Sequence, residues 1–103
     1  MPTSTAVVPT DVPSRYAKQL VEHLGRKNVV QEVPGSPHAR RLVFAYGIGV
    51  VRPETARLVL DASAPDDEAL SRVEDVLSRH LERFGQRNGL VVRWQRQIAS
   101  QAE

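Results

Sequence analysis

The sequence predicts an α+β fold in two layers, with two helices on one face of a largely antiparallel sheet. Two stretches, residues 13–24 and 65–84, repeat apolar side chains every three or four positions, which is the spacing of one helical face. Shorter stretches around them alternate apolar and polar side chains, as strands with one buried face do. The expected order is β-α-β-β-(β)-β-α-β. The nearest simple arrangement is ferredoxin-like, with one extra strand or one long bent strand.

The first third of the chain predicts a strand, a helix and a second strand. Residues 4–8 are expected to form a short strand that ends at the prolines of the following turn. Pro13 suits the first position of a helix and Gly25 suits its end, and apolar residues recur at every fourth position between them. Residues 28–33 are expected to form the next strand, and residues 34–38, PGSPH, a loop.

The middle of the chain predicts an interrupted strand and then a regular one. Residues 40–52 alternate until Gly47 and Gly49 break the pattern, which indicates a bulge, a kink or a tight connection. Residues 57–63 alternate without a break, so we expect a strand with one buried face.

The helix expected at residues 65–84 has clear signals at both ends. Pro65 suits the first turn, the three acidic residues after it lie where the helix dipole favours negative charge, and Gly85 is typical of a C-terminal cap. Its apolar face consists of Leu70, Val73, Leu77, Leu81 and Phe84. The ion pairs expected on its outer face join Glu68 to Arg72 and Asp75 to Arg79.

The end of the chain predicts a last strand and a tail. Residues 90–96 alternate again, and Trp94 is expected in the core, where its removal would cost ~3 to 5 kcal/mol. Residues 97–103 have no strong pattern and are expected to fray. We therefore expect residues 1–96 to form a single α+β domain.

Composition excludes several classes of protein. No apolar run approaches the ~18 residues that a membrane span requires, and the first ten residues lack both a basic leader and a continuous apolar core. The sequence contains no cysteine, which excludes a disulfide, a thiolate metal site and a cysteine nucleophile and suits the cytoplasm. The few aromatic residues fall on predicted core faces, so nucleic-acid binding is not expected.

The three histidines do not predict a metal site. His23, His38 and His80 show no metal-ligand spacing, and the ends of two antiparallel helices are expected to place His23 far from His80. A histidine near a helix end ordinarily interacts with the free carbonyls there. Phosphate-binding, dinucleotide-binding and serine-nucleophile motifs are missing, so we assign no cofactor and no catalytic residue.

The sheet face away from the helices is expected to carry valines inside a charged rim. This combination is typical of a protein interface, and it predicts a homodimer. The alternative is that β-branched residues only stabilise exposed strands. The residues expected on this interface are Val43, Val51, Val59 and Val91.

Four stretches of the chain resemble a known family. They are TDVPSRYAKQLVEHLGRK, LVFAYG, APDDEALSRVEDVLSRHLERFG and LVVRWQ. On these motifs, chiefly HLERFG and Trp94, residues 6–96 resemble the small bacterial domain-of-unknown-function family 2218. The recurrent family residues matched here are His23, Lys27, Gly47, His80, Arg83, Phe84 and Trp94. Related chains often have a cysteine shortly after the glycine that corresponds to Gly47, so any thiol function is lost in this chain.

The resemblance implies an accessory role without naming a chemistry. Members are often encoded beside, or fused to, flavin-containing siderophore-interacting proteins, which implies a partner of that kind and a link to iron acquisition. The first hypothesis is thus a non-enzymatic accessory or binding domain that self-associates. The second is a small-ligand domain for a siderophore, flavin or haem, with Tyr46, Gly47, His80 and Arg83 as its binding residues. The third is an enzyme with His80 as general base.

Overall fold

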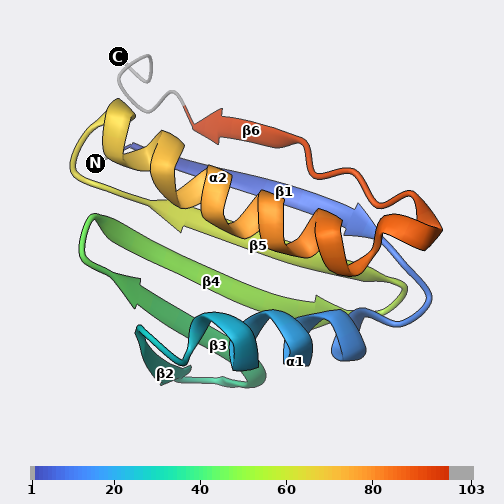
Figure 1. Cartoon of the computed structure of the whole chain (residues 1–103). Coiled ribbons are helices and arrows are strands. Elements are labelled where there is room, and N and C mark those ends of the chain that lie inside the picture. The colour runs from blue at the N-terminus through green and yellow to red at the C-terminus, as the bar shows by residue number, and fades with distance from the viewer. Residues whose placement is uncertain (1, 98–103) are drawn as a thin grey trace.

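A six-stranded antiparallel sheet carries both helices on one face (Figure 1). The computed structural model describes residues 2–97, so the predicted tail lies outside the described residues from residue 98 onward. In chain order the elements are β1 (Thr3–Pro9), α1 (Pro13–Leu24), β2 (Val29–Val33), β3 (Ser36–Phe44), β4 (Gly47–Glu54), β5 (Arg57–Ser63), α2 (Asp67–Phe84), the short 3-10 helix η1 (Gln86–Asn88) and β6 (Trp94–Gln97). The predicted two-layer α+β class is confirmed.

The strand order is β2-β3-β4-β5-β1-β6. Without β2 and β3, the remaining order β4-β5-β1-β6 and the two helices form the ferredoxin-like β-α-β-β-α-β unit. The structure therefore adds two strands to that unit, which is the predicted order with its optional strand present. The loop expected at residues 34–38 is wrong, because the chain already turns at Gly35 (φ 79°) and β3 begins at Ser36. Proline is tolerated near the beginning of a strand, which is the place of Pro37 in β3.

The interrupted strand predicted at residues 40–52 is a hairpin, so the glycines mark a tight connection. β3 ends at Phe44, and β4 begins after a two-residue turn at Gly47. A Cβ atom on Gly47 would lie 2.6 Å from the Ser63 carbonyl oxygen and 2.6 Å from a Val73 methyl group. Glycine at this position lets α2 lie directly on the hairpin.

Helix α2 begins two residues later than predicted. Asp66 is the N-cap, and its carboxylate accepts a hydrogen bond of 2.8 Å from the Ala69 N–H, so Pro65 precedes the cap. Of the two expected ion pairs, Asp75 and Arg79 form one at 2.8 Å. Arg72 lies instead over the ring of Tyr46, 4.1 Å from its centroid.

The core lies between the sheet and the apolar faces of both helices. α1 contributes Tyr16, Ala17, Leu20 and Leu24, and α2 contributes Leu70, Val73, Leu77 and Leu81. The main sheet residues beneath them are Ala6, Val8, Leu42, Phe44, Val51, Leu58, Leu60 and Ala62. Each helical stripe predicted from the sequence is therefore buried, except that Phe84 is only partly buried.

The last strand is shorter than predicted. β6 begins at Trp94, and the residues before it pack against α2 outside the sheet. The Val92 N–H donates to the Glu82 carboxylate at 2.9 Å, and the Trp94 indole N–H donates to the Ser78 hydroxyl at 2.6 Å. These two hydrogen bonds attach residues 92–94 to α2. The apolar residues of the alternating pattern therefore pack against the core, although residues 90–93 do not pair with a strand. Trp94 is partly buried rather than central to the core.

Between residues 2 and 97, neither helix combines the length and the apolar character that a membrane crossing needs.

Candidate functional site

The rings of His23 and His80 lie side by side, with their centroids 4.7 Å apart. The prediction that these histidines lie at opposite ends of the helix layer is therefore wrong. The helices do run in opposite directions (Figure 1). However, the two helices are staggered over the sheet, so His23 near the end of α1 lies beside the last turns of α2 rather than beside its beginning.

The strand register explains why the end of α1 lies beside this part of α2. A Cβ on Gly25, just after α1, would lie 2.9 Å from the Val30 side chain. Val30 pairs with Leu42, and Leu42 pairs with Gly49. The position of a Cβ on Gly49 is 3.0 Å from the Leu77 side chain of α2. The C-terminal end of α1 and the turn of α2 that follows Leu77 thus lie over the same level of the sheet.

The histidine pair also contacts Phe84, one turn after His80. The Phe84 and His23 rings meet edge to face, with centroids 5.7 Å apart. The Nδ1 atom of His80 lies 2.7 Å from the Val76 carbonyl oxygen. Because a carbonyl can only accept, Nδ1 carries the proton, and in the neutral ring Nε2 is left as the acceptor.

Positive charge gathers around the pair. Packing against neighbouring groups lowers the pKa of His23, and the positive charges of His80, Arg26, Arg83 and Lys27 lower it further. Within residues 2–97, Arg26, Lys27 and Arg83 form no ion pair with a carboxylate. This corner of the molecule therefore has positive charge that no acidic side chain of the described chain offsets. No third residue joins the pair in a group that could hold a metal ion in that same part of the chain.

A hollow of about 240 Å³ lies next to His80, between α2 and the β3–β4 turn. It is lined by Tyr46, Arg72, Asp75, Val76, Arg79 and His80. The Tyr46 ring stacks on Phe44 with centroids 5.5 Å apart and carries the Arg72 guanidinium on its face. Asp75 is already paired with Arg79. The hollow thus offers an aromatic wall, a histidine edge and an arginine without an acidic partner among residues 2–97.

Two of the four predicted ligand residues meet in this hollow, Tyr46 and His80. Gly47 lies beneath α2, where Val73 and Ser63 occupy the space beside it, so its role is helix packing. Arg83 is exposed and lines another shallow hollow with Glu82 and Leu90, although its charge reaches His23.

Sequence reasoning missed His23 and Arg72 as members of this site. No signal in the sequence indicated His23, because the stagger of the two helices depends on how each helix packs on the sheet. The position of Arg72 depends on the β3–β4 turn, which brings Tyr46 under α2. The sequence predicted this turn only as a break in the strand at residues 40–52.

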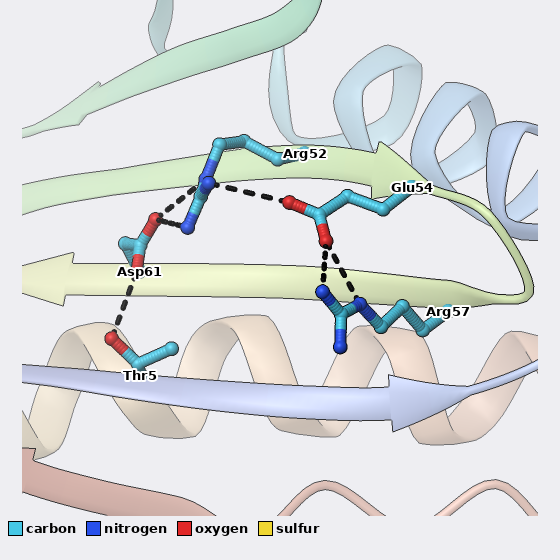
Figure 2. Close-up of polar contacts among 5 residues, drawn as sticks. All are labelled: Thr5, Arg52, Glu54, Arg57 and Asp61. Atoms are coloured by element: carbon cyan, nitrogen blue, oxygen red, sulfur yellow. Dashed lines mark hydrogen bonds and ion pairs between the residues drawn. The ribbon is translucent and has the colours of Figure 1, made fainter.

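The opposite face of the sheet is open, and charged groups cross its centre (Figure 2). The Thr5 hydroxyl donates to Asp61 at 2.8 Å, and Arg52 bonds the other oxygen of that carboxylate at 2.8–2.9 Å. Arg52 also lies 3.4 Å from Glu54, which accepts from Arg57 at 2.8 Å. The centre of this face therefore carries charged groups beside the cross-strand pair Val7 and Val59, so the expected apolar centre with charges only at its rim is wrong.

Apolar residues gather instead at the end of the open face near the β3–β4 turn. Val29, Val43 and Ile48 are successive cross-strand partners on β2, β3 and β4 and so form one row. Val50 lies on the same face two residues further along β4. We call these four residues the apolar row. Val29 is 58% exposed, so this row is accessible, as is Val7 of β1, which is 49% exposed on the same face.

The four predicted interface residues are not on one surface. Val43 and Val59 lie on the open face, but Val59 is only 4% exposed. Val51 is fully buried in the core beneath the helices, because Val43 pairs with Ile48 and the open face passes from odd to even positions across the turn. Val91 is 55% exposed in the segment before β6, outside the sheet.

The fold and these surfaces define a small two-layer α+β domain with a basic, aromatic hollow on its helix side. A family model described as "Uncharacterized protein conserved in bacteria (DUF2218)" matches residues 5–95, so the chain belongs to this bacterial family. The predicted resemblance is confirmed. The NMR structure of PA4090 from Pseudomonas aeruginosa is similar, with a TM-score of 0.74 and 25% sequence identity over 92% of this chain and 96% of that chain. No curated protein matches the sequence significantly.

Proposed function

We propose that this protein is a non-enzymatic binding domain that takes a flat, anionic small molecule at the corner formed by His23, His80, Tyr46 and Arg72. The observation that carries the proposal is the set of cations beside the histidine pair, which no carboxylate of the described residues neutralises. A negatively charged ligand would supply the missing counter-charge.

The aromatic groups define the shape of the ligand. Tyr46, His80 and His23 present ring faces and edges, and such groups favour a planar, conjugated partner. The hollow of about 240 Å³ is smaller than the ~300 to 1,000 Å³ of a pocket that buries a drug-sized ligand. The site would therefore hold one edge of a planar ligand and leave the rest exposed.

Three ligand classes combine flat rings with negative charge: ferric catecholate siderophores, flavin mononucleotide and haem. The family resemblance favours the siderophore class and, as protein partner, a siderophore-interacting flavoprotein. A ligand left half exposed by this domain would remain accessible to such a partner. The absence of cysteine from the sequence suits a cytoplasmic setting for this role.

The enzyme alternative, with His80 as general base, has less support. The groups that face His80 across the hollow are a phenol, two arginines and an aspartate that Arg79 already engages. This set is suited to holding an anion, whereas general-base catalysis also needs a reacting group positioned beside Nε2.

The test is a thermal-shift and calorimetric titration with ferric enterobactin, flavin mononucleotide and haem. A ligand at about 100 times its Kd stabilises a folded protein by about 2.7 kcal/mol, which in a domain of this size raises Tm by roughly 10 °C or more. The variant Lys27→Glu should weaken binding at least tenfold, because it reverses a charge beside His23. Lys18→Glu, the same change at the other lysine, is the control and should leave Kd within twofold. The proposal is wrong if no probe raises Tm, or if the two variants weaken binding equally.

Self-association is a second candidate, supported by the exposed apolar row. Burial of this row against the same row of a second copy would give a symmetric contact. Light scattering at about 50 μM should then report a dimer, and Val29→Lys should return it to a monomer. Val91→Lys, an equally exposed valine outside the row, is the control. A monomeric parent protein at this concentration excludes the candidate.

A further inference from the structure

A second concave surface lies on the helix side of the sheet, between α1 and the beginning of β3. This groove of about 250 Å³ shares no residue with the hollow beside His80. Ala17, Val21 and Pro53 form its apolar walls, and Val51 lies at its base. Its polar rim consists of Ser14, Lys18, Glu22, His38 and Arg40.

Arg40 is held in place at this rim. It pairs with Val51 across β3 and β4, which puts it on the same side of the sheet as α1. Its Nη1 atom donates to the carbonyl oxygens of Pro37 and Ala39, both at 2.8 Å. Glu32 is the cross-strand partner of Arg40 on β2. In residues 2–97, however, no carboxylate lies within ion-pair distance of the Arg40 guanidinium, so its Nε and Nη2 donors have no acidic partner there.

A guanidinium fixed in this way is preorganised to bind a planar anion such as a carboxylate. Two parallel N–H bonds to one carboxylate are the geometry that arginine favours, and the two carbonyl contacts reduce the side-chain entropy that binding would cost. Lys18 and His38 add basic groups at the rim, and Glu22 is the one acidic lining residue. An apolar body would lie against Ala17, Val21 and Pro53.

We propose that this groove binds a small carboxylic acid with an apolar, aromatic-sized body, the carboxylate on Arg40 and the body between α1 and β4. The inference does not rest on the anionic-ligand site beside His80, because the two sites use different arginines and the two hollows share no lining residue. A ligand of this kind needs one carboxylate and an apolar ring, whereas the site beside His80 favours an extended planar system held at one edge.

The test is a ¹H–¹⁵N NMR titration with naphthalene-2-carboxylate and its neutral analogue naphthalene-2-carboxamide. The carboxylate should give saturable shifts at the amides of Ala17, Lys18, Val21, Arg40 and Val51. The carboxamide should bind at least tenfold more weakly. Shifts that do not saturate, that centre on Tyr46 and His80, or that are equal for both probes would overturn the proposal.

Matched variants locate the charge. Arg40→Gln should weaken the carboxylate at least tenfold, whereas Arg41→Gln, the next residue on the opposite face of the sheet, should change Kd less than twofold. If Arg40→Gln does not fold, Lys18→Glu tests at an exposed position whether the groove needs positive charge to bind the carboxylate. Lys27→Glu is then the control. In this titration Lys18→Glu should weaken binding and Lys27→Glu should not, which is the reverse of the result expected at the site beside His80. Equal responses of the paired variants would contradict the groove proposal and leave the other site untouched.

Discussion

His23 and His80 meet at 4.7 Å although their helices run antiparallel, because the helices are staggered and the end of α1 lies beside the last turns of α2. This contact concentrates two imidazoles and three cationic side chains in one corner of the molecule. It makes the protonation of His23 dependent on folding and on any anion that binds nearby.

The His23 contact predicts a pH dependence of stability. The pKa of His23 is lowered in the folded state, chiefly by packing and then by the charges of His80, Arg26, Arg83 and Lys27. His23 therefore binds a proton more readily in the unfolded chain than in the folded protein. The stability that neutral His23 contributes is present above its unfolded pKa of 6.5 and is lost as the pH falls below that value. Urea unfolding between pH 5 and 7.5 should show stability rising with pH. His23→Gln should flatten this rise, while His38→Gln should not. An unchanged slope in His23→Gln would contradict the prediction.

Gly47→Ala should destabilise the fold by about 1 to 3 kcal/mol, because the new methyl group would overlap a backbone carbonyl and Val73. Gly49→Ala is the matched comparison. Its methyl group would lie 3.0 Å from the end of the flexible Leu77 side chain, which can move aside, so a smaller loss is expected. Chemical denaturation of both variants checks this order. A larger loss of stability in Gly49→Ala than in Gly47→Ala would show that α2 does not pack closely against Gly47.

The hydrogen bond from Trp94 to Ser78 should contribute about 1 kcal/mol. Trp94→Phe keeps most of the apolar surface and removes the donor, and Ser78→Ala removes the acceptor. A double-mutant cycle should give a coupling energy of this size. Trp94→Ala should cost more, but less than a fully buried tryptophan would, because the side chain is only partly buried. Coupling near zero would mean that the bond does not hold β6 to α2.

The ion pair between Arg52 and Asp61 should contribute little in isolation. Both side chains are about one-third exposed, at 37% and 33%, and partly exposed pairs give about 0.2 to 1 kcal/mol. A double-mutant cycle with Arg52→Gln and Asp61→Asn should fall in this range at low salt. In 1 M NaCl the coupling should decrease, because the pair faces solvent. A larger, salt-independent coupling would show that the open face is covered in solution.

The sequence predicted elements better than it predicted contacts between them. Helix α1 and strand β5 have the predicted ends, because proline, glycine and an unbroken alternation act on their own neighbours along the chain. The errors occur where the pattern depended on a distant element. Gly49 broke the alternation because Leu77 of α2 lies over it, and residues 90–93 alternate because Leu90 and Val92 pack against the core outside the sheet.

The candidate site shows the same division. Tyr46 and His80 were predicted together from the family resemblance, and the structure brings them to one hollow. The contact between His23 and His80 depends on the stagger of the two helices. The burial of Val51 depends on the register of the β3–β4 hairpin.

By itself the sequence determined the fold class, the two helical faces and the family, because apolar periodicity and local end signals need no knowledge of distant contacts. Only the tertiary structure decided which side chains face one another across elements. Those pairings depend on register, helix overlap and the two-residue turn, and a shift of one residue in the register or in the turn places a strand side chain on the other side of the sheet.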